Sequence, residues 1–277
     1  IFGFTRSFKK KNLNNLKKFN VLSNLNLKIY NENNPNSILM YIKKQKPEEI
    51  YYFAGQSSVG RSFKKPLETY KSNINLLFLI LEFVRINSLK TKIYNSCSTD
   101  CFGNSRKILK NEKDTFKPVS PYGNSKAFAF WLTKFYREKY NLNCKSGILS
   151  NHESPLRNHN FVLKRIVNFA RNRKKNQKLY LGNISVYRDW GWAPEYVEAI
   201  YKINNSKLNK DYVVGTGEIV SLKYIVNKVF KLSKIGNKYL KVNHHKSFRP
   251  HEIKKIGCDS RLIFHDLNWK PKIRIKK

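Results

Sequence analysis

Three side chains in the middle of the sequence have the types and spacing of a site that oxidises an alcohol. Tyr122 and Lys126 are four residues apart in the segment SPYGNSK, residues 120–126. On a helix such residues share one face, so the Lys126 ammonium can approach the Tyr122 phenol, favour its phenolate and let it accept a proton. The four-residue spacing alone is weak support for a catalytic pair, because a chain with 16 Tyr and many Lys contains such pairs by chance. Ser98, after an apolar run, adds a hydroxyl that could hold the substrate oxygen.

These residues need a scaffold that brings strand ends and helix starts together. Short apolar runs alternate with longer amphipathic ones, which is typical of βαβ units. The pattern predicts strands at 27–30, 50–54, 92–97 and 144–149, and helices at 35–44, 67–86 and 122–140. Such a series forms an α/β fold, a Rossmann-like doubly wound parallel sheet whose ligands bind beyond the carboxyl ends of the strands.

The pattern changes at about Asn151, where irregular polar segments begin. Short strands at 179–181 and 212–214 and helices near Pro194 and Ser221 predict a smaller α/β substrate-binding domain. We therefore expect a Rossmann domain at 1–150 and a mainly substrate-binding domain at 151–277, with segments that return to the core.

Several segments together carry a resemblance to known proteins. They are YYFAGQSSV at 51–59, STDCFG at 98–103, SPYGNSK at 120–126, NHESP at 151–155, YRDWG at 187–191 and FRPHE at 248–252. With them the sequence resembles the extended short-chain dehydrogenase/reductases and, within these, the GDP-mannose 4,6-dehydratase family, over nearly the whole chain. NHESP followed by Arg157 and then RDWG discriminates best, because many relatives share only YxxxK.

The resemblance implies a lyase that converts GDP-mannose to GDP-4-keto-6-deoxymannose by oxidation at C4, loss of water across C5 and C6, and reduction at C6. Tyr122 would remove the proton of the 4-hydroxyl with Ser98 beside it, while Lys126 tunes the phenol and holds the nicotinamide ribose. Asp100 matches the position of the family glutamate that takes the C5 proton. Alternatively, the Asp100 carboxylate could have only a structural role, as a cap at the end of the strand that accepts hydrogen bonds from the backbone of Cys101 or Phe102.

The resemblance also implies binding residues. Arg6 ends an apolar run where arginine accepts the 2′-phosphate of NADP, so NADP is the expected cofactor. Besides Tyr122 and Lys126, the implied cofactor contacts are Arg6, Ala54 and Gln56, and the substrate contacts are Asn151, Lys164, Arg188 and Arg249. Asn151 could instead form an Asx turn, and any single cation could be a solvated surface group. His152 is expected to pack in the core, and no metal site is expected.

The composition limits the other partners. The chain has 55 Lys and Arg against 18 Asp and Glu, a net charge of +37. The cations are scattered among abundant Asn, Ile, Phe and Tyr, which favours a codon bias over a selected polyanion surface, so no specific nucleic acid is expected. No apolar run approaches the roughly 20 residues of a membrane helix. The four Cys form no CxxC pair and no extracellular disulfide framework, which favours a reducing compartment, so a cytoplasmic location is expected. We also expect a homo-oligomer, either a dimer or a tetramer.

The start of the sequence predicts a truncated chain. Position 1 is Ile, the only methionine is Met40, and the glycine-rich turn that holds the cofactor pyrophosphate is expected upstream of Arg6. We expect the fragment alone to aggregate and to bind NADP weakly. The alternatives are a sugar-nucleotide 4-epimerase or 4-ketoreductase, which would not need Asp100, and a non-catalytic polyanion-binding remnant.

Overall fold

The computed structural model describes residues 1–5, 10–18, 20–31, 34–242 and 251–276, so Arg6 and Arg249 lie outside the described residues. Its central sheet has four parallel strands in the order β10-β6-β4-β3. The strands are β3 (Glu49–Tyr52), β4 (Lys92–Ser98), β6 (Cys144–Leu149) and β10 (Tyr212–Val214). Because all four run in one direction, their carboxyl ends share one edge, where Ser98 lies opposite Leu149.

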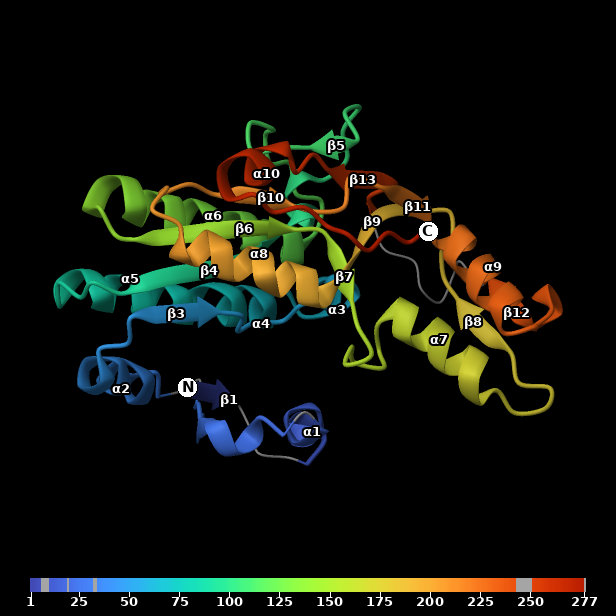
Figure 1. Ribbon diagram of the computed structural model, residues 1–277, viewed down its shortest axis with the longest axis horizontal. Coiled ribbons are helices and arrows are strands. Elements are labelled where there is room, and N and C mark those ends of the chain that lie inside the picture. The colour runs from blue at the N-terminus through green and yellow to red at the C-terminus, as the bar shows by residue number, and fades with distance from the viewer. Residues whose placement is uncertain (6–9, 19, 32–33, 243–250, 277) are drawn as a thin grey trace.

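Helices cover both faces of this sheet (Figure 1). Neighbouring residues of β4 point to opposite faces: Ile93 packs with α5 and α6, and Tyr94 packs with α8. The helices that enclose the sheet or flank its edges are α2 (Asn36–Gln45), α3 (Val59–Lys64), α4 (Pro66–Tyr70), α5 (Leu76–Ile86), α6 (Pro121–Tyr140), α8 (Ala193–Asn205) and α10 (Arg261–Leu267). The alternating apolar runs of the sequence are therefore the strands of a sheet that is buried on both sides.

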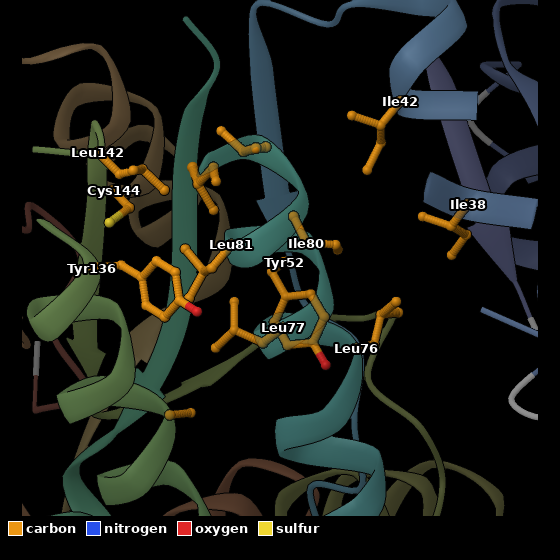
Figure 2. Packing of buried hydrophobic residues seen from close by; sticks show 13 residues of the cluster. Ile38, Ile42, Tyr52, Leu76, Leu77, Ile80, Leu81, Tyr136, Leu142 and Cys144 are labelled. Carbon is orange, nitrogen blue, oxygen red and sulfur yellow. The ribbon is translucent and has the colours of Figure 1, made fainter. Parts of the chain in front are cut away.

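One apolar cluster joins the sheet to its helices (Figure 2). Leu77 and Leu81 of α5 pack with Tyr52 of β3 and Tyr136 of α6, and both leucines are fully buried. Each buried leucine side chain contributes on the order of 2 kcal/mol relative to an exposed one. This packing fixes α6, and with it the YxxxK pair, against the sheet.

The first part of the chain forms a separate two-stranded parallel sheet. Its strands are β1 (Phe2–Thr5) and β2 (Asn26–Ile29). The chain between these strands contains α1 (Lys10–Lys18) and the short 3₁₀ helix η1 (Leu22–Asn24). Among the described residues, neither strand pairs with β3.

A second region lies beyond the carboxyl edge of the main sheet, at the right in Figure 1. One sheet contains β5 (Leu109–Lys110), β7 (Asn151–Glu153), β9 (Tyr187–Trp192), β11 (Ile219–Ser221) and β13 (Lys255–Cys258). Further out lie α7 (Val162–Asn172), β8 (Leu179–Leu181), α9 (Leu222–Leu232), η4 (Asn237–Tyr239) and β12 (Leu240–Val242). β10 returns to the main sheet beside β6.

The structure confirms the predicted α/β class and differs in three details. The strand predicted at 27–30 is β2, which pairs with β1 and, among the described residues, does not join the main sheet. The helix predicted at 67–86 consists of α4, a π-helical turn η2 (Lys71–Asn75) and α5. A π turn widens the helix by one residue, which hydrophobic spacing does not reveal. The strands β5, β7, β9, β11, β12 and β13 were not predicted, because each is only two to six residues long and lacks a long apolar or alternating pattern. The proposed boundary at 150/151 stays a prediction.

Candidate active site

The carboxyl end of β4 supplies the first two groups of the site. Ser98 is the last residue of β4, and Asp100 lies in the following 3₁₀ helix η3 (Thr99–Phe102). The Ser98 hydroxyl accepts a hydrogen bond from the Asp100 backbone N–H and donates one to Asp100 Oδ2, both at 3.2 Å. The cap of this helix is therefore the hydroxyl of Ser98, and not the Asp100 carboxylate as in the structural alternative.

The amino terminus of α6 approaches η3 very closely. Ser120 caps the helix, since its hydroxyl accepts the Gly123 N–H at 3.0 Å, and Pro121 occupies the first turn. A Cβ on Gly123 would lie 2.6 Å from the Asp100 carbonyl oxygen. Glycine at this position therefore permits the contact that places Tyr122 beside Ser98 and Asp100.

The Tyr122 phenol is buried, with 8% of its surface exposed. Burial raises its pKa above the usual range, the nearby Asp100 charge raises it further, and a hydrogen bond with the Ser98 side chain lowers it. The sequence predicted the opposite net direction, from the nearby lysine. The difference has a physical reason: removing the phenol from water destabilises the phenolate by more than the Ser98 hydrogen bond stabilises it.

The Lys126 ammonium is also buried, and Nζ donates to the Ser96 carbonyl at 2.8 Å. Burial lowers the pKa of Lys126, and the nearby Cys97 and Cys101 thiols oppose this effect. The lysine is thus held one helical turn below Tyr122, anchored to β4. It can supply positive charge under the site without contacting solvent.

The loop after β3, which we call the cofactor floor, contains the predicted cofactor contacts Ala54 and Gln56. Ala54 is exposed, and Gly55 has φ of +135°, a conformation that favours glycine. The Gln56 side chain is buried and donates to the Ser58 carbonyl and to Thr69 Oγ1, so it shapes the loop and presents no free amide. Ala54 and the loop backbone are therefore better placed than the Gln56 side chain to meet a ligand.

A buried asparagine under this loop was missed at the sequence level. Asn73 lies in the π-helical turn, and its Nδ2 donates to the Gln56 carbonyl at 3.2 Å and to Ser125 Oγ at 2.8 Å. Its Oδ1 is buried without a hydrogen-bond partner and faces Gly55. No spacing rule points to Asn73, since only the π turn rotates it toward the loop. It ties the cofactor floor to α6.

The substrate-side residues come from several elements. Arg188 of β9 and Asp100 line one small cavity, together with Ser120, His251 and Glu252. The latter three were not among the predicted site residues, although His251 and Glu252 belong to the quoted FRPHE segment. The structure thus brings a cation and a carboxylate to one cavity from positions 88 residues apart in the sequence.

Asn151 and Lys164 occupy less central positions. Asn151 is half-buried in β7, where it pairs with Trp190, so it lies in a strand and not in an Asx turn. Lys164 Nζ donates to the Pro155 carbonyl at 2.6 Å and holds the loop before α7. His152 packs in the core as expected: its ring stacks on Tyr196 with centroids 4.9 Å apart. The predicted contacts of Arg6 and Arg249 lie outside the described residues.

In the described parts of the chain, no group of three or more His, Cys, Asp or Glu side chains could hold a metal ion. The same residues include no helix that is long and apolar enough to cross a bilayer.

Comparison with known sequences gives a consistent result. A family model described as GDP-mannose 4,6 dehydratase matches residues 1–277. The GDP-mannose 4,6-dehydratase of Sinorhizobium fredii is 37% identical over 199 residues, which cover 70% of this chain and 57% of that protein. GDP-mannose 4,6 dehydratase 1 of Arabidopsis thaliana is 36% identical over 248 residues, which cover 87% of this chain and 68% of that protein. The human GDP-mannose 4,6 dehydratase is 32% identical over 268 residues, which cover 85% of this chain and 69% of that protein. The matches therefore span 57–69% of the length of these relatives.

Comparison with solved structures supports the same fold. A dTDP-glucose 4,6-dehydratase from Bacillus anthracis in complex with NAD superposes with a TM-score of 0.86 at 20% identity, covering 100% of this chain and 84% of that chain. A UDP-glucose 4-epimerase from Thermotoga maritima with UDP-glucose gives a TM-score of 0.82 at 18% identity, covering 99% and 94%. At these identities the likeness shows the fold, which confirms the predicted Rossmann-like architecture.

Proposed function

Because this chain belongs to the GDP-mannose 4,6-dehydratase family, we propose that the natural protein that carries it converts GDP-mannose to GDP-4-keto-6-deoxymannose. The observation that carries the proposal is the meeting of a hydroxyl, a carboxylate, a phenol and an ammonium where β4 ends and α6 begins. These groups are Ser98, Asp100, Tyr122 and Lys126. A non-catalytic remnant would have no need of this arrangement.

The proposed cofactor is NADP. The support for a nicotinamide dinucleotide is the fold, in which related structures hold NAD, and the floor after β3 with the Gly55 turn and the orphaned Asn73 Oδ1. When bound, the nicotinamide would accept two electrons from C4 and return them at C6. The proposed contacts are Ala54, the loop at Gln56 through its backbone, Tyr122 and Lys126, and the preference for the 2′-phosphate form rests on Arg6 in the sequence.

Proton removal from the substrate 4-hydroxyl is assigned to Tyr122. Its phenol lies beside the Ser98 hydroxyl, which now donates to Asp100 Oδ2 and can turn its one proton to the same substrate oxygen when the sugar is bound. Since burial raises the pKa of Tyr122, the phenol needs a nearby cation to act as a base, and the buried Lys126 ammonium supplies it.

Elimination of water is assigned to Asp100. Oxidation at C4 makes the C5 hydrogen acidic, and a carboxylate within the same cavity can remove it as the C6 hydroxyl leaves. The Ser98 hydroxyl donates to Asp100 Oδ2, which orients the carboxylate and leaves Oδ1 available. An aspartate reaches one methylene less far than a glutamate, so the sugar must lie close to η3.

The diphosphate of the substrate is anionic and needs cations near the sugar site. Arg188 lines the Asp100 cavity, and a guanidinium can pair with diphosphate oxygens through two parallel hydrogen bonds. Arg249, Lys164 and Asn151 complete the proposed set. A homo-oligomer and a location in the cytoplasm belong to the same proposal.

Product analysis tests this function. The natural protein that carries the chain is incubated with GDP-mannose and NADP, and the product mass is measured. The expected product has lost one water, and Tyr122→Phe should lower turnover by about 10²- to 10⁴-fold, as for a lost general base. A product of unchanged mass, epimerised at C4, would replace the proposal with the epimerase alternative.

A further inference from the structure

The outermost region of the molecule has an unusual charge distribution. We call it the basic lobe: residues 162–181 and 222–242, which comprise α7, β8, α9, η4 and β12 (right side of Figure 1). It contains 13 Lys and Arg and no Asp or Glu. The absence of acids extends along the sequence from 154 to 188 and from 219 to 251. All 18 acidic residues of the chain therefore lie elsewhere.

An acid-free stretch is not in itself unusual in this chain, since residues 1–31 contain seven Lys and Arg and no Asp or Glu. The lobe differs because two such stretches, far apart in the sequence, pack against each other and present their cations on one part of the molecule. Inside the lobe the apolar side chains, among them Ile166, Phe169 and Phe230, are used for a buried cluster between α7 and α9. The charged side chains are left on the outer surface, where they meet no acid of their own lobe.

Part of this surface alternates cations with tyrosine rings. β8 and β12 are parallel neighbours, and Lys241 lies directly across from Tyr180. Tyr180 is 58% exposed, and its carbonyl accepts a hydrogen bond from Arg165 Nη2 at 2.7 Å. Beside them the guanidinium of Arg173 stands 4.0 Å from the ring centre of Tyr239.

We propose that the basic lobe binds single-stranded nucleic acid without regard to sequence. The phosphates of an extended strand would pair with Arg165, Lys238 and Lys241, and the exposed Tyr180 ring would stack on a base. Proteins of this kind combine a cationic track with aromatic stacking surfaces. An exposed tyrosine favours a single strand over a duplex, in which the base faces are already stacked. The proposal is separate from the dehydratase reaction, because Lys164 is the one proposed substrate contact within the lobe and is not among the residues assigned to the nucleic acid.

The test measures binding of a fluorescein-labelled oligo-dT of about 20 nucleotides to the whole chain by fluorescence anisotropy. Three phosphate contacts on a single strand give a salt slope of about −2.1, so affinity should fall about 20-fold between about 50 and about 200 mM salt. Lys238→Glu/Lys241→Glu should weaken binding by more than about tenfold. Tyr180→Ala should weaken single-strand binding and leave duplex binding of equal length unchanged, since stacking needs free bases.

Lys207→Glu is the control, because Lys207 is an exposed lysine on the loop between α8 and β10, at the amino edge of the main sheet. It should change affinity by less than about twofold. Equal losses for Lys207→Glu and a lobe lysine would overturn the proposal, since binding would then follow total charge. Preference for the duplex, or for vesicles containing phosphatidylserine over the oligonucleotide, would overturn it as well. Thermal unfolding of every variant separates lost binding from lost folding.

Discussion

Substitution of Gly123 by alanine tests how the two halves of the catalytic site are brought together. The added Cβ would lie 2.6 Å from the Asp100 carbonyl oxygen, where ordinary contacts begin at 3.4 Å. The carbonyl belongs to the backbone of η3 and cannot rotate away as a flexible side chain would. The amino terminus of α6 must therefore move from η3 by roughly 0.8 Å, the difference between these two distances.

The consequences for activity and for stability should differ in size. Tyr122 moves with α6 while Ser98 and Asp100 stay with β4, and a misplacement of about 1 Å can cost about 10²-fold in rate. Overpacking costs about 1–3 kcal/mol, and the better helix propensity of alanine returns about 1 kcal/mol. We expect kcat to fall by about 10- to 100-fold with a net destabilisation of about 0–2 kcal/mol.

The assay compares kcat on GDP-mannose with thermal unfolding for the same variants. Gly236→Ala is the matched control, because its Cβ would meet nothing nearer than Lys238 Cγ at 3.9 Å, and it should change neither quantity measurably. Parental kcat in Gly123→Ala would refute the reasoning, since it would mean that the contact between α6 and η3 does not set the position of Tyr122.

Three further predictions concern single side chains. Asp100→Asn should still reduce the cofactor, seen as a transient rise in reduced-nicotinamide absorbance, but should form no dehydrated product; unchanged product formation would remove Asp100 from the elimination step. Lys126→Met should move the acidic limb of the pH–rate profile to higher pH, because burial already raises the pKa of Tyr122 and loss of the cation raises it further; an unmoved limb would contradict the role of Lys126. Arg137→Met should cost about 3–5 kcal/mol in urea unfolding, because it leaves the buried Asp211 carboxylate, now bound by Arg137 Nη1 at 2.8 Å, without its cation. Arg137→Met/Asp211→Asn should recover most of that loss, because asparagine removes the charge and keeps an oxygen for the Ser146 N–H that Asp211 Oδ1 now accepts at 2.7 Å; a double variant as unstable as the single one would show that the unpaired charge is not the cause.

The sequence predicted the scaffold well because its signals are local. The strand at 144–149 and the short strands at 179–181 and 212–214 have the predicted bounds. The last of these, YVV, is the continuous, fully buried apolar run expected of a strand in a parallel sheet. The long helix after Ser120 was also predicted, because a serine cap and a proline in the first turn mark a helix start.

The details of the site depend on tertiary contacts and could not be predicted. The pKa direction of Tyr122 follows from burial, which a YxxxK spacing does not report. Asn73 reaches the loop at Gly55 only through a π turn, and Ser98 rather than Asp100 caps η3 because of the local backbone. His251 and Glu252 reach the Asp100 cavity only because the chain returns from the substrate side.

The most direct test of the proposed reaction follows one atom through it. GDP-mannose labelled with deuterium at C4 is incubated with the natural protein that carries this chain, in ordinary water with NADP, and the product is analysed by NMR. If the site oxidises C4, eliminates water and reduces C6, deuterium should appear at C6 and the hydrogen at C5 should come from solvent. Deuterium retained at C4 of a product that has kept its C6 oxygen would contradict the proposed function.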